Sequence, residues 1–163
     1  MRACLFLLIT ATLVGGCATS YHEKSIFGGY VNSEISEDIV EVVFWANQFT
    51  STEKTADFAM YRCAETTLLR GSNYFVVLSS ELFIDRERLS RWTDKQTPRV
   101  YKRIKILNEH SREVVEHSAF VYDAKELGQS LGLKYGELKG RLPDQARPAS
   151  TENESSQDAA SNR

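Results

Sequence analysis

Residues 39–45 read I-V-E-V-V-F-W, and this stretch decides the fold. Its β-branched and aromatic side chains occupy both alternating faces of an extended chain, with Glu41 as the exception. Such a run is typical of a short strand that is buried largely on both sides. A preceding strand over residues 30–35 is expected to pair with it as a hairpin.

A long helix is predicted directly after this strand. Residues 47–52 turn the chain, and either Ser51 or Thr52 can cap the free amides of a helix that starts at residue 53 or 54. The helix runs to residue 70, where Gly71 is placed to end it. One side of the helix collects the side chains expected to face the core, which are Ala56, Met60, Cys63, Ala64 and Thr67, with Leu68 at the margin.

The rest of the chain adds strands and one more helix. Apolar or alternating runs predict strands over residues 74–78, 100–107 and 114–122. Asp123 and Glu126 have capping-box spacing for a closing helix, whose inner face carries Leu127 and Leu131. The predicted fold class is α+β: one small domain, with a mostly antiparallel sheet of four to five strands packed by one long helix and a short C-terminal helix.

Length and charge limit the classes of protein that fit. A chain of 163 residues with 42% hydrophobic and 26% charged residues is typical of one globular domain. Its net charge of -2 argues against a general nucleic-acid binder, which is usually strongly basic. We therefore expect no nucleic-acid partner.

The N-terminus predicts export and a lipid anchor. Residues 1–16 form a signal peptide, with Arg2 before an apolar stretch that is too short to span a bilayer. Residues 13–17 read L-V-G-G-C and resemble the lipobox of bacterial lipoproteins, in which the cysteine is acylated and becomes the new N-terminus. Cys17 is thus the predicted lipidation site. The alternative is an uncleaved or ordinary signal sequence in which Cys17 is incidental.

Domain boundaries follow from composition. Residues 17–27 are predicted to be the lipidated cysteine and a tether, residues 28–141 the globular domain, and residues 142–163 a disordered tail poor in apolar side chains. Because no Asp follows Cys17, known sorting rules favour the periplasmic face of the outer membrane. Cys4 leaves with the signal peptide and Cys17 carries lipid, so Cys63 has no partner for an internal disulfide. It is expected to be a buried apolar side chain, with an exposed redox-sensing thiol as the alternative.

Several motifs within residues 21–136 carry a family resemblance: the G-G-Y of residues 28–30, the V-V-F-W-A-N of residues 42–47, the Y-R-C-A-E-T-T-L of residues 61–68, Gly71 followed by Tyr74-Phe75, and Tyr122-Asp123-Ala124. By these motifs the sequence resembles an uncharacterised family of small proteobacterial envelope lipoproteins. The resemblance implies a lipid-anchored periplasmic domain and supplies no activity. Two departures are Ala46, where the family often has Gly, and Cys63, at a position that is usually small and apolar.

Arg62 and Glu65 are the first candidate binding residues. They lie three apart on the predicted helix and are therefore neighbours, flanked by Phe58 and Leu69. In the functional interpretation, the planar fork of Arg62 holds a carboxylate or phosphate. In the structural interpretation, the two side chains pair with each other or with loop backbone beneath a covering segment such as residues 83–92.

A basic segment is the second candidate. Residues 85–105 contain eight basic and three acidic residues, a net charge of +5, whereas residues 22–60 have a net charge of -5. We expect Arg86, Arg88 and Arg91, together with Trp92, to face anionic lipid or the cell-wall polymer. The alternative is that the two charged stretches attract each other within the fold.

Neither a cofactor nor a metal is predicted. His22, His110 and His117 lack the paired spacing of a zinc site, and the chain has no nucleophile elbow or Gly-rich phosphate loop. The expected function is therefore a lipid-anchored, periplasm-facing envelope protein, a non-catalytic binding or structural module at the membrane surface. Its protein partner is not identified by the sequence. The alternative is an envelope enzyme whose site is assembled from scattered residues.

Overall fold

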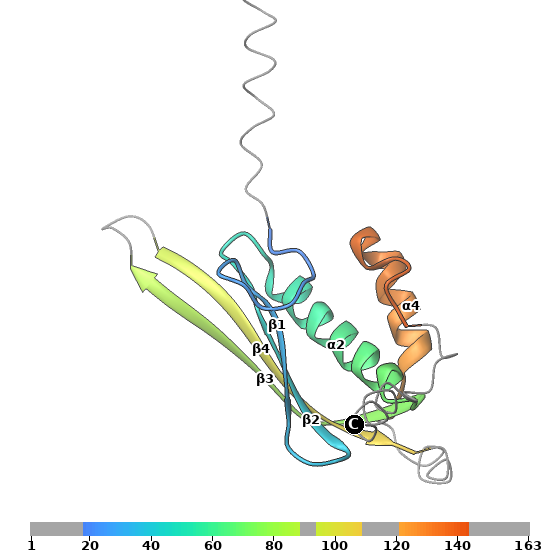
Figure 1. Cartoon of the computed structure of the whole chain (residues 1–163). Helices are drawn as coiled ribbons and strands as arrows, with labels where there is room; N and C mark the ends of the chain where they lie inside the picture. The colour runs from blue at the N-terminus through green and yellow to red at the C-terminus, as the bar shows by residue number, and fades with distance from the viewer. Residues whose placement is uncertain (1–17, 89–93, 109–120, 144–163) are drawn as a thin grey trace, which may run out of the picture.

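The computed structural model describes residues 18–88, 94–108 and 121–143. They form one antiparallel sheet in the order β1-β2-β4-β3-β5, with the long helix α2 against one face and the shorter α4 packed on α2 (Figure 1). The predicted α+β fold class is confirmed. The predicted signal peptide, Cys17 and most of the predicted tail lie outside the described residues.

The N-terminal half of the sheet is the predicted hairpin. β1 (Gly29–Glu34) pairs with β2 (Ile39–Trp45), and β2 continues the sheet by pairing with β4 (Asp94–Leu107). Val42, Val43 and Phe44 are all buried although they alternate between the two faces of β2. Burial of this strand on both sides is therefore confirmed.

β3 (Tyr74–Arg88) and β4 are much longer than the strands predicted over residues 74–78 and 100–107. They pair from Tyr74 opposite Leu107 out to Arg88 opposite Asp94, with a register shift between Val77 and Ser79. The predictions stopped where the apolar runs stop, but main-chain pairing continues through the charged residues. We call the outer part of this hairpin, residues 80–88 and 94–100, the arm. It extends past α2 (Figure 1).

Both helices begin at the predicted caps. α2 (Thr52–Leu69) starts after Ser51, whose hydroxyl accepts a hydrogen bond from the Lys54 amide at 3.1 Å. Gly71 follows its end with a positive φ of 73°. α4 (Ala124–Lys134) starts after Asp123, whose carboxylate accepts from the Glu126 amide at 2.9 Å. A short 3₁₀ turn, η3 (Gly136–Leu138), and the brief strand β5 (Val121–Asp123) complete the described elements.

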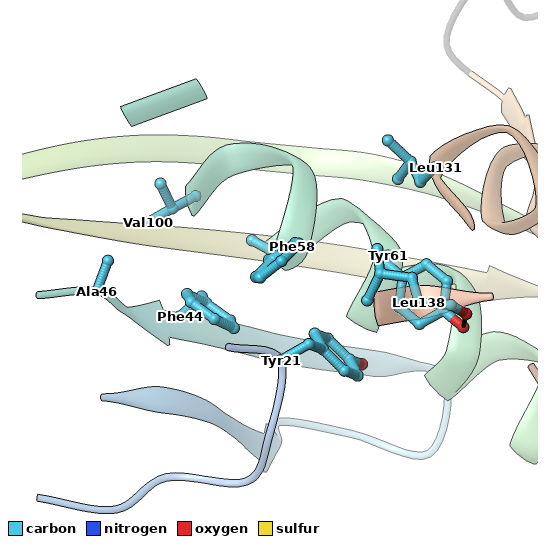
Figure 2. Close-up of a cluster of buried hydrophobic side chains, with 9 residues drawn as sticks. Tyr21, Phe44, Ala46, Phe58, Tyr61, Val100, Leu131 and Leu138 are labelled. Atoms are coloured by element: carbon cyan, nitrogen blue, oxygen red, sulfur yellow. Dashed lines mark hydrogen bonds between the residues drawn. The ribbon is translucent and has the colours of Figure 1, made fainter. Parts of the chain in front are cut away.

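The core face of α2 is broader than predicted. Cys63, Ala64, Thr67 and Leu68 are buried as expected, but Ala56 and Met60 are only half-buried. Phe58, Ala59 and Tyr61 are fully buried instead (Figure 2). Ala56 and Met60 still pack against the core, so the predicted face is correct but too narrow. The reason is that α2 contacts the sheet on one side, α4 on another and the N-terminal segment on a third.

The N-terminal segment belongs to the fold. Tyr21 is 2% exposed and stacks edge-on against Phe58 and Tyr61, with ring centroids 5.7 and 5.0 Å away (Figure 2). Its amide donates to a Glu137 carboxylate oxygen at 3.1 Å, and its carbonyl accepts from Arg141 at 2.8 Å. The tether predicted over residues 17–27 is therefore wrong for the described part, because burying the Tyr21 ring ties it to the core.

The C-terminal boundary also moves. Leu142, which was assigned to the disordered tail, packs partly buried against both hydrophobic clusters of the core. Its side chain lies so close to α4 that a Cβ added at Gly128 would be 2.7 Å from it. The predicted domain end at residue 141 is therefore one residue too early at least, since Leu142 contributes apolar contacts.

Candidate functional site

Arg62 and Glu65 form an ion pair that is almost enclosed. Arg62 Nη1 lies 2.7 Å from Glu65 Oε2, and only 15% and 14% of the two side chains are exposed. Arg62 Nε donates to the Asn32 amide oxygen at 3.1 Å, and the guanidinium lies 4.0 Å from the centroid of the Tyr30 ring. The arginine thus makes three contacts within the protein.

Glu65 is held from a second direction by the N-terminal segment. The Tyr21 hydroxyl donates to the same carboxylate oxygen that pairs with Arg62. Burial, followed by the charge of Glu65, raises the pKa of Tyr21 far above its ordinary value, so the phenol remains a donor. Burial opposes the charge of Arg62, but the hydrogen bond and the charge of Glu65 outweigh it and raise the pKa of Arg62.

These contacts favour the structural interpretation of the pair. Arg62 already binds a carboxylate and an amide oxygen, so a ligand would have to displace Glu65 or Asn32. Residues 83–88 of the predicted covering segment belong to the arm, and residues 89–92 lie outside the described part of the chain; the contacts to the pair come from Tyr21, Tyr30 and Asn32. The (i, i+3) spacing was enough to predict the pair, but not its cover, which comes from β1 and the N-terminal segment.

The basic segment is only partly described. Arg86 is exposed on the arm, Arg88 is the last residue of β3, and Arg91 and Trp92 lie outside the described residues. Acidic neighbours balance some of the charge, because Asp85 pairs with Arg99 at 2.8 Å and Glu87 with Lys95 at 3.7 Å. Arg86 and Arg88 lie on the arm, whereas Arg62 lies on α2.

Cross-strand pairs join the acidic and basic stretches. Glu41 of β2 pairs with Arg103 of β4 at 3.0 Å, and Asp38, just before β2, pairs with Lys105 at 3.4 Å. The alternative that the two charged stretches attract each other within the fold gains support from these contacts. Such exposed pairs stabilise a fold only weakly.

Two titratable groups lie between α2 and the sheet. Cys63 is fully buried, and burial raises the pKa of its thiol to about 12. A thiol in that state is a small apolar side chain, as expected, and it does not fit a redox sensor. Lys102 is also buried, donates to the Ser80 hydroxyl at 2.8 Å, and has a pKa lowered by burial. Lys102 was not among the predicted site residues, although this lysine continues the inward alternation of Ile104 and Ile106.

A cavity of about 490 Å³ opens beside α4. Its size is in the range of small-molecule sites. The lining combines apolar side chains with the polar residues Lys125, Gln129 and Lys139, and no carboxylate or histidine is among the described residues that line it. The arrangement offers positive charge and apolar surface, but not the acid and base pair of a hydrolytic site. The apolar lining comes from Leu68, Leu133, Leu138, Leu142 and Pro143.

Within the part of the chain that the structure describes, no three His, Cys, Asp or Glu side chains lie together as metal ligands would. The same residues contain no helix long and apolar enough to cross a membrane. Comparison of the chain with known protein families, with curated proteins and with solved structures finds no match.

Proposed function

We propose that the protein is a bacterial envelope lipoprotein, anchored by lipid on Cys17 at the periplasmic face of the outer membrane, and that its domain is a non-catalytic binding or structural module. The signal-like residues 1–16 and the L-V-G-G-C of residues 13–17 support the anchor. The resemblance to small envelope lipoproteins agrees with it.

The observation that supports placing the domain directly against the membrane is the burial of Thr19. Its amide donates to the Thr50 hydroxyl at 2.7 Å, and its own hydroxyl accepts from the Asn47 amide at 2.8 Å. Thr19 is only two residues after Cys17, a span of about 7 Å when fully extended. A lipid on Cys17 would therefore hold the domain itself against the membrane, instead of holding it at the end of a tether.

The bonding within the polar cluster favours a structural role for Arg62 and Glu65 over catalysis. The Arg62 guanidinium and the Tyr21 hydroxyl both donate to the enclosed carboxylate of Glu65. The competing class is an envelope enzyme whose site is assembled from scattered residues. It would need convergent acid and base groups in a pocket, and the cavity beside α4 is the place where a bound substrate would be sought.

An anionic surface is the proposed partner of the basic segment, residues 85–105. Arg86, Arg88 and Arg91, with Trp92, would meet lipid head groups or the cell-wall polymer. Each basic residue close to an anionic bilayer contributes about 1 kcal/mol of attraction, which salt screens. The exposure of Arg86 and the reach of the arm past α2 support this role, and Asp85 and Glu87 weaken it.

The anchor is tested by Cys17→Ala, with Cys63→Ala as the matched control. Cells that express each full-length variant are supplied with labelled fatty acid, and the protein is followed in membrane and soluble fractions. We expect wild type and Cys63→Ala to take up label and to remain in the membrane fraction, and Cys17→Ala to lose both. Incorporation of label into Cys17→Ala would refute the anchor.

The basic segment is tested by replacing Arg86, Arg88 and Arg91 with Glu. Lys125→Glu, at an exposed position on α4, is the control. The test uses the unacylated Cys17→Ala protein, because a lipid anchor would hold every variant on vesicles. Its binding to anionic vesicles or cell-wall sacculi is measured at low and high salt. We expect the triple reversal alone to abolish the salt-sensitive binding. Binding that changes neither with salt nor with the triple substitution would refute the proposed contact of the basic segment with an anionic surface.

A further inference from the structure

Three large apolar side chains project into solvent around Thr19. Ile26 is 92% exposed, Phe27 72% and Phe49 58%. We call these three residues the N-terminal rim. Single exposed apolar residues are common on protein surfaces, whereas a group of them marks a contact surface.

Thr19 connects the two loops that carry the rim. Its hydroxyl donates to the carbonyl of Phe27 at 3.3 Å and accepts from the amide of Asn47 at 2.8 Å. Phe49 follows two residues later in that second loop, where its amide donates to the Asn47 side chain at 3.0 Å. The rim therefore surrounds the point at which the chain arrives from Cys17.

The turn that presents Ile26 and Phe27 is fixed. The main chains of Ser25 and Gly28 exchange two hydrogen bonds, of 2.7 and 3.2 Å. Gly28 has a φ of 109° and lies so close to β2 that an added Cβ would be 2.5 Å from the Trp45 carbonyl oxygen. A glycine is required there, and the turn holds both apolar side chains outward.

We propose that the N-terminal rim inserts into the apolar edge of the bilayer that holds the lipid of Cys17. The inference rests on the proposed lipid anchor, because about 7 Å of chain then separates the acylated residue from Thr19. At that distance the rim lies at the level of the head groups, where apolar side chains are stabilised by leaving water.

The residues next to the rim suit a membrane interface. Trp45 lies at the end of β2, with Lys24 Nζ 3.9 Å from the centroid of its ring and the Arg99 guanidinium 5.6 Å away. Tryptophan and long cationic side chains are the usual interfacial anchors. Lys24 and Arg99 would then place positive charge at the head groups, beside the apolar side chains of the rim.

Ile35 provides a matched control. It is a half-exposed isoleucine in the turn between β1 and β2, at the opposite end of β2 from Trp45 (Figure 1). Seven residues of β2 separate the two ends by roughly 20 Å. A probe at this turn should remain in water while a probe at the rim is in lipid.

The experiment places a polarity-sensitive fluorophore on Ile26→Cys, Phe49→Cys or Ile35→Cys in the full-length protein, after acylation and reconstitution into phosphatidylglycerol-containing vesicles. Cys63 is fully buried and should not react. Emission is recorded with and without nitroxide-bearing lipid, and then with a water-soluble quencher. Acylation is checked by mass on the same samples.

We expect labels at residues 26 and 49 to shift to shorter wavelength and to lose intensity with the nitroxide lipid, while the label at residue 35 is quenched only from water. Equal behaviour of all three labels on acylated protein would overturn the rim proposal alone. So would rim labels shielded from both quenchers, because a second protein surface would then cover them. Absence of acylation would remove the lipid anchor and this inference with it.

Discussion

Replacing Glu65 by Gln should lower the free energy of unfolding by about 3 kcal/mol. The substitution keeps the shape of the side chain and one acceptor oxygen, but it removes the negative charge that faces Arg62 at 2.7 Å. Arg62 is then left charged with only 15% of its side chain in solvent. The Tyr21 hydroxyl loses its charged acceptor in the same change.

The expected loss of unfolding free energy in Glu65→Gln lies between two limits. Breaking an exposed ion pair costs about 0 to 1 kcal/mol, and removing one partner of a buried pair costs about 3 to 5 kcal/mol. The small exposure of Arg62 and Glu65 puts them near the buried limit, whereas the amide of Gln still accepts one hydrogen bond. For a domain of this size, a loss of about 3 kcal/mol lowers the melting temperature by roughly 10 °C.

Glu34→Gln is the matched control, because Glu34 also pairs with an arginine, Arg70, but has 78% of its side chain exposed. Both variants are unfolded with denaturant at constant pH, and the unfolding free energies are compared. We expect a change below about 1 kcal/mol for Glu34→Gln. Equal losses in the two variants, or no loss in Glu65→Gln, would refute the structural role of the Arg62 pair.

Three further changes test the fold. Gly28→Ala should cost about 3 kcal/mol, through backbone strain and a clash with β2, whereas Gly136→Ala, with open space around it, should be neutral in a thermal melt. Lys102→Met should raise unfolding free energy at pH 7 by about 1 kcal/mol, because burial lowers the folded-state pKa of Lys102 and penalises its charge. That advantage should shrink as pH rises toward 10.5, where the unfolded chain also deprotonates, and a pH-independent gain would contradict it. Leu142→Ala should cost about 2 kcal/mol in denaturant unfolding, whereas ending the chain after residue 143 should leave stability unchanged.

Local rules were enough for several elements. The hairpin of β1 and β2 follows from a β-branched and aromatic run of a few residues. The caps at Ser51, one of the two candidates, and at Asp123 depend only on residues three positions away. The ion pair of Arg62 and Glu65 is equally local. Each of these was predicted because its partners are close in sequence.

Long-range packing explains what was missed. Tyr21 is one aromatic residue in a polar stretch, so no periodic pattern marks it, and its main-chain partners are 116 and 120 residues further along. The predicted core face of α2 was too narrow because three different neighbours bury the helix. A single apolar stripe predicts the buried residues of a helix that packs on one surface. Phe58 and Tyr61 lie outside that stripe and are nevertheless buried.

The bonds that hold Tyr21 from Glu137 and Arg141 also set the order in which the polypeptide can fold. A nascent chain that has released its first 107 residues holds α2 and strands β1 to β4, but neither Glu137 nor Arg141, which hold the main chain of Tyr21. Closing a loop of this length is slow compared with forming a helix or a hairpin. During synthesis and export the aromatic pocket would therefore stay open until residue 141 emerges, and the ends of the domain would be the last parts to join.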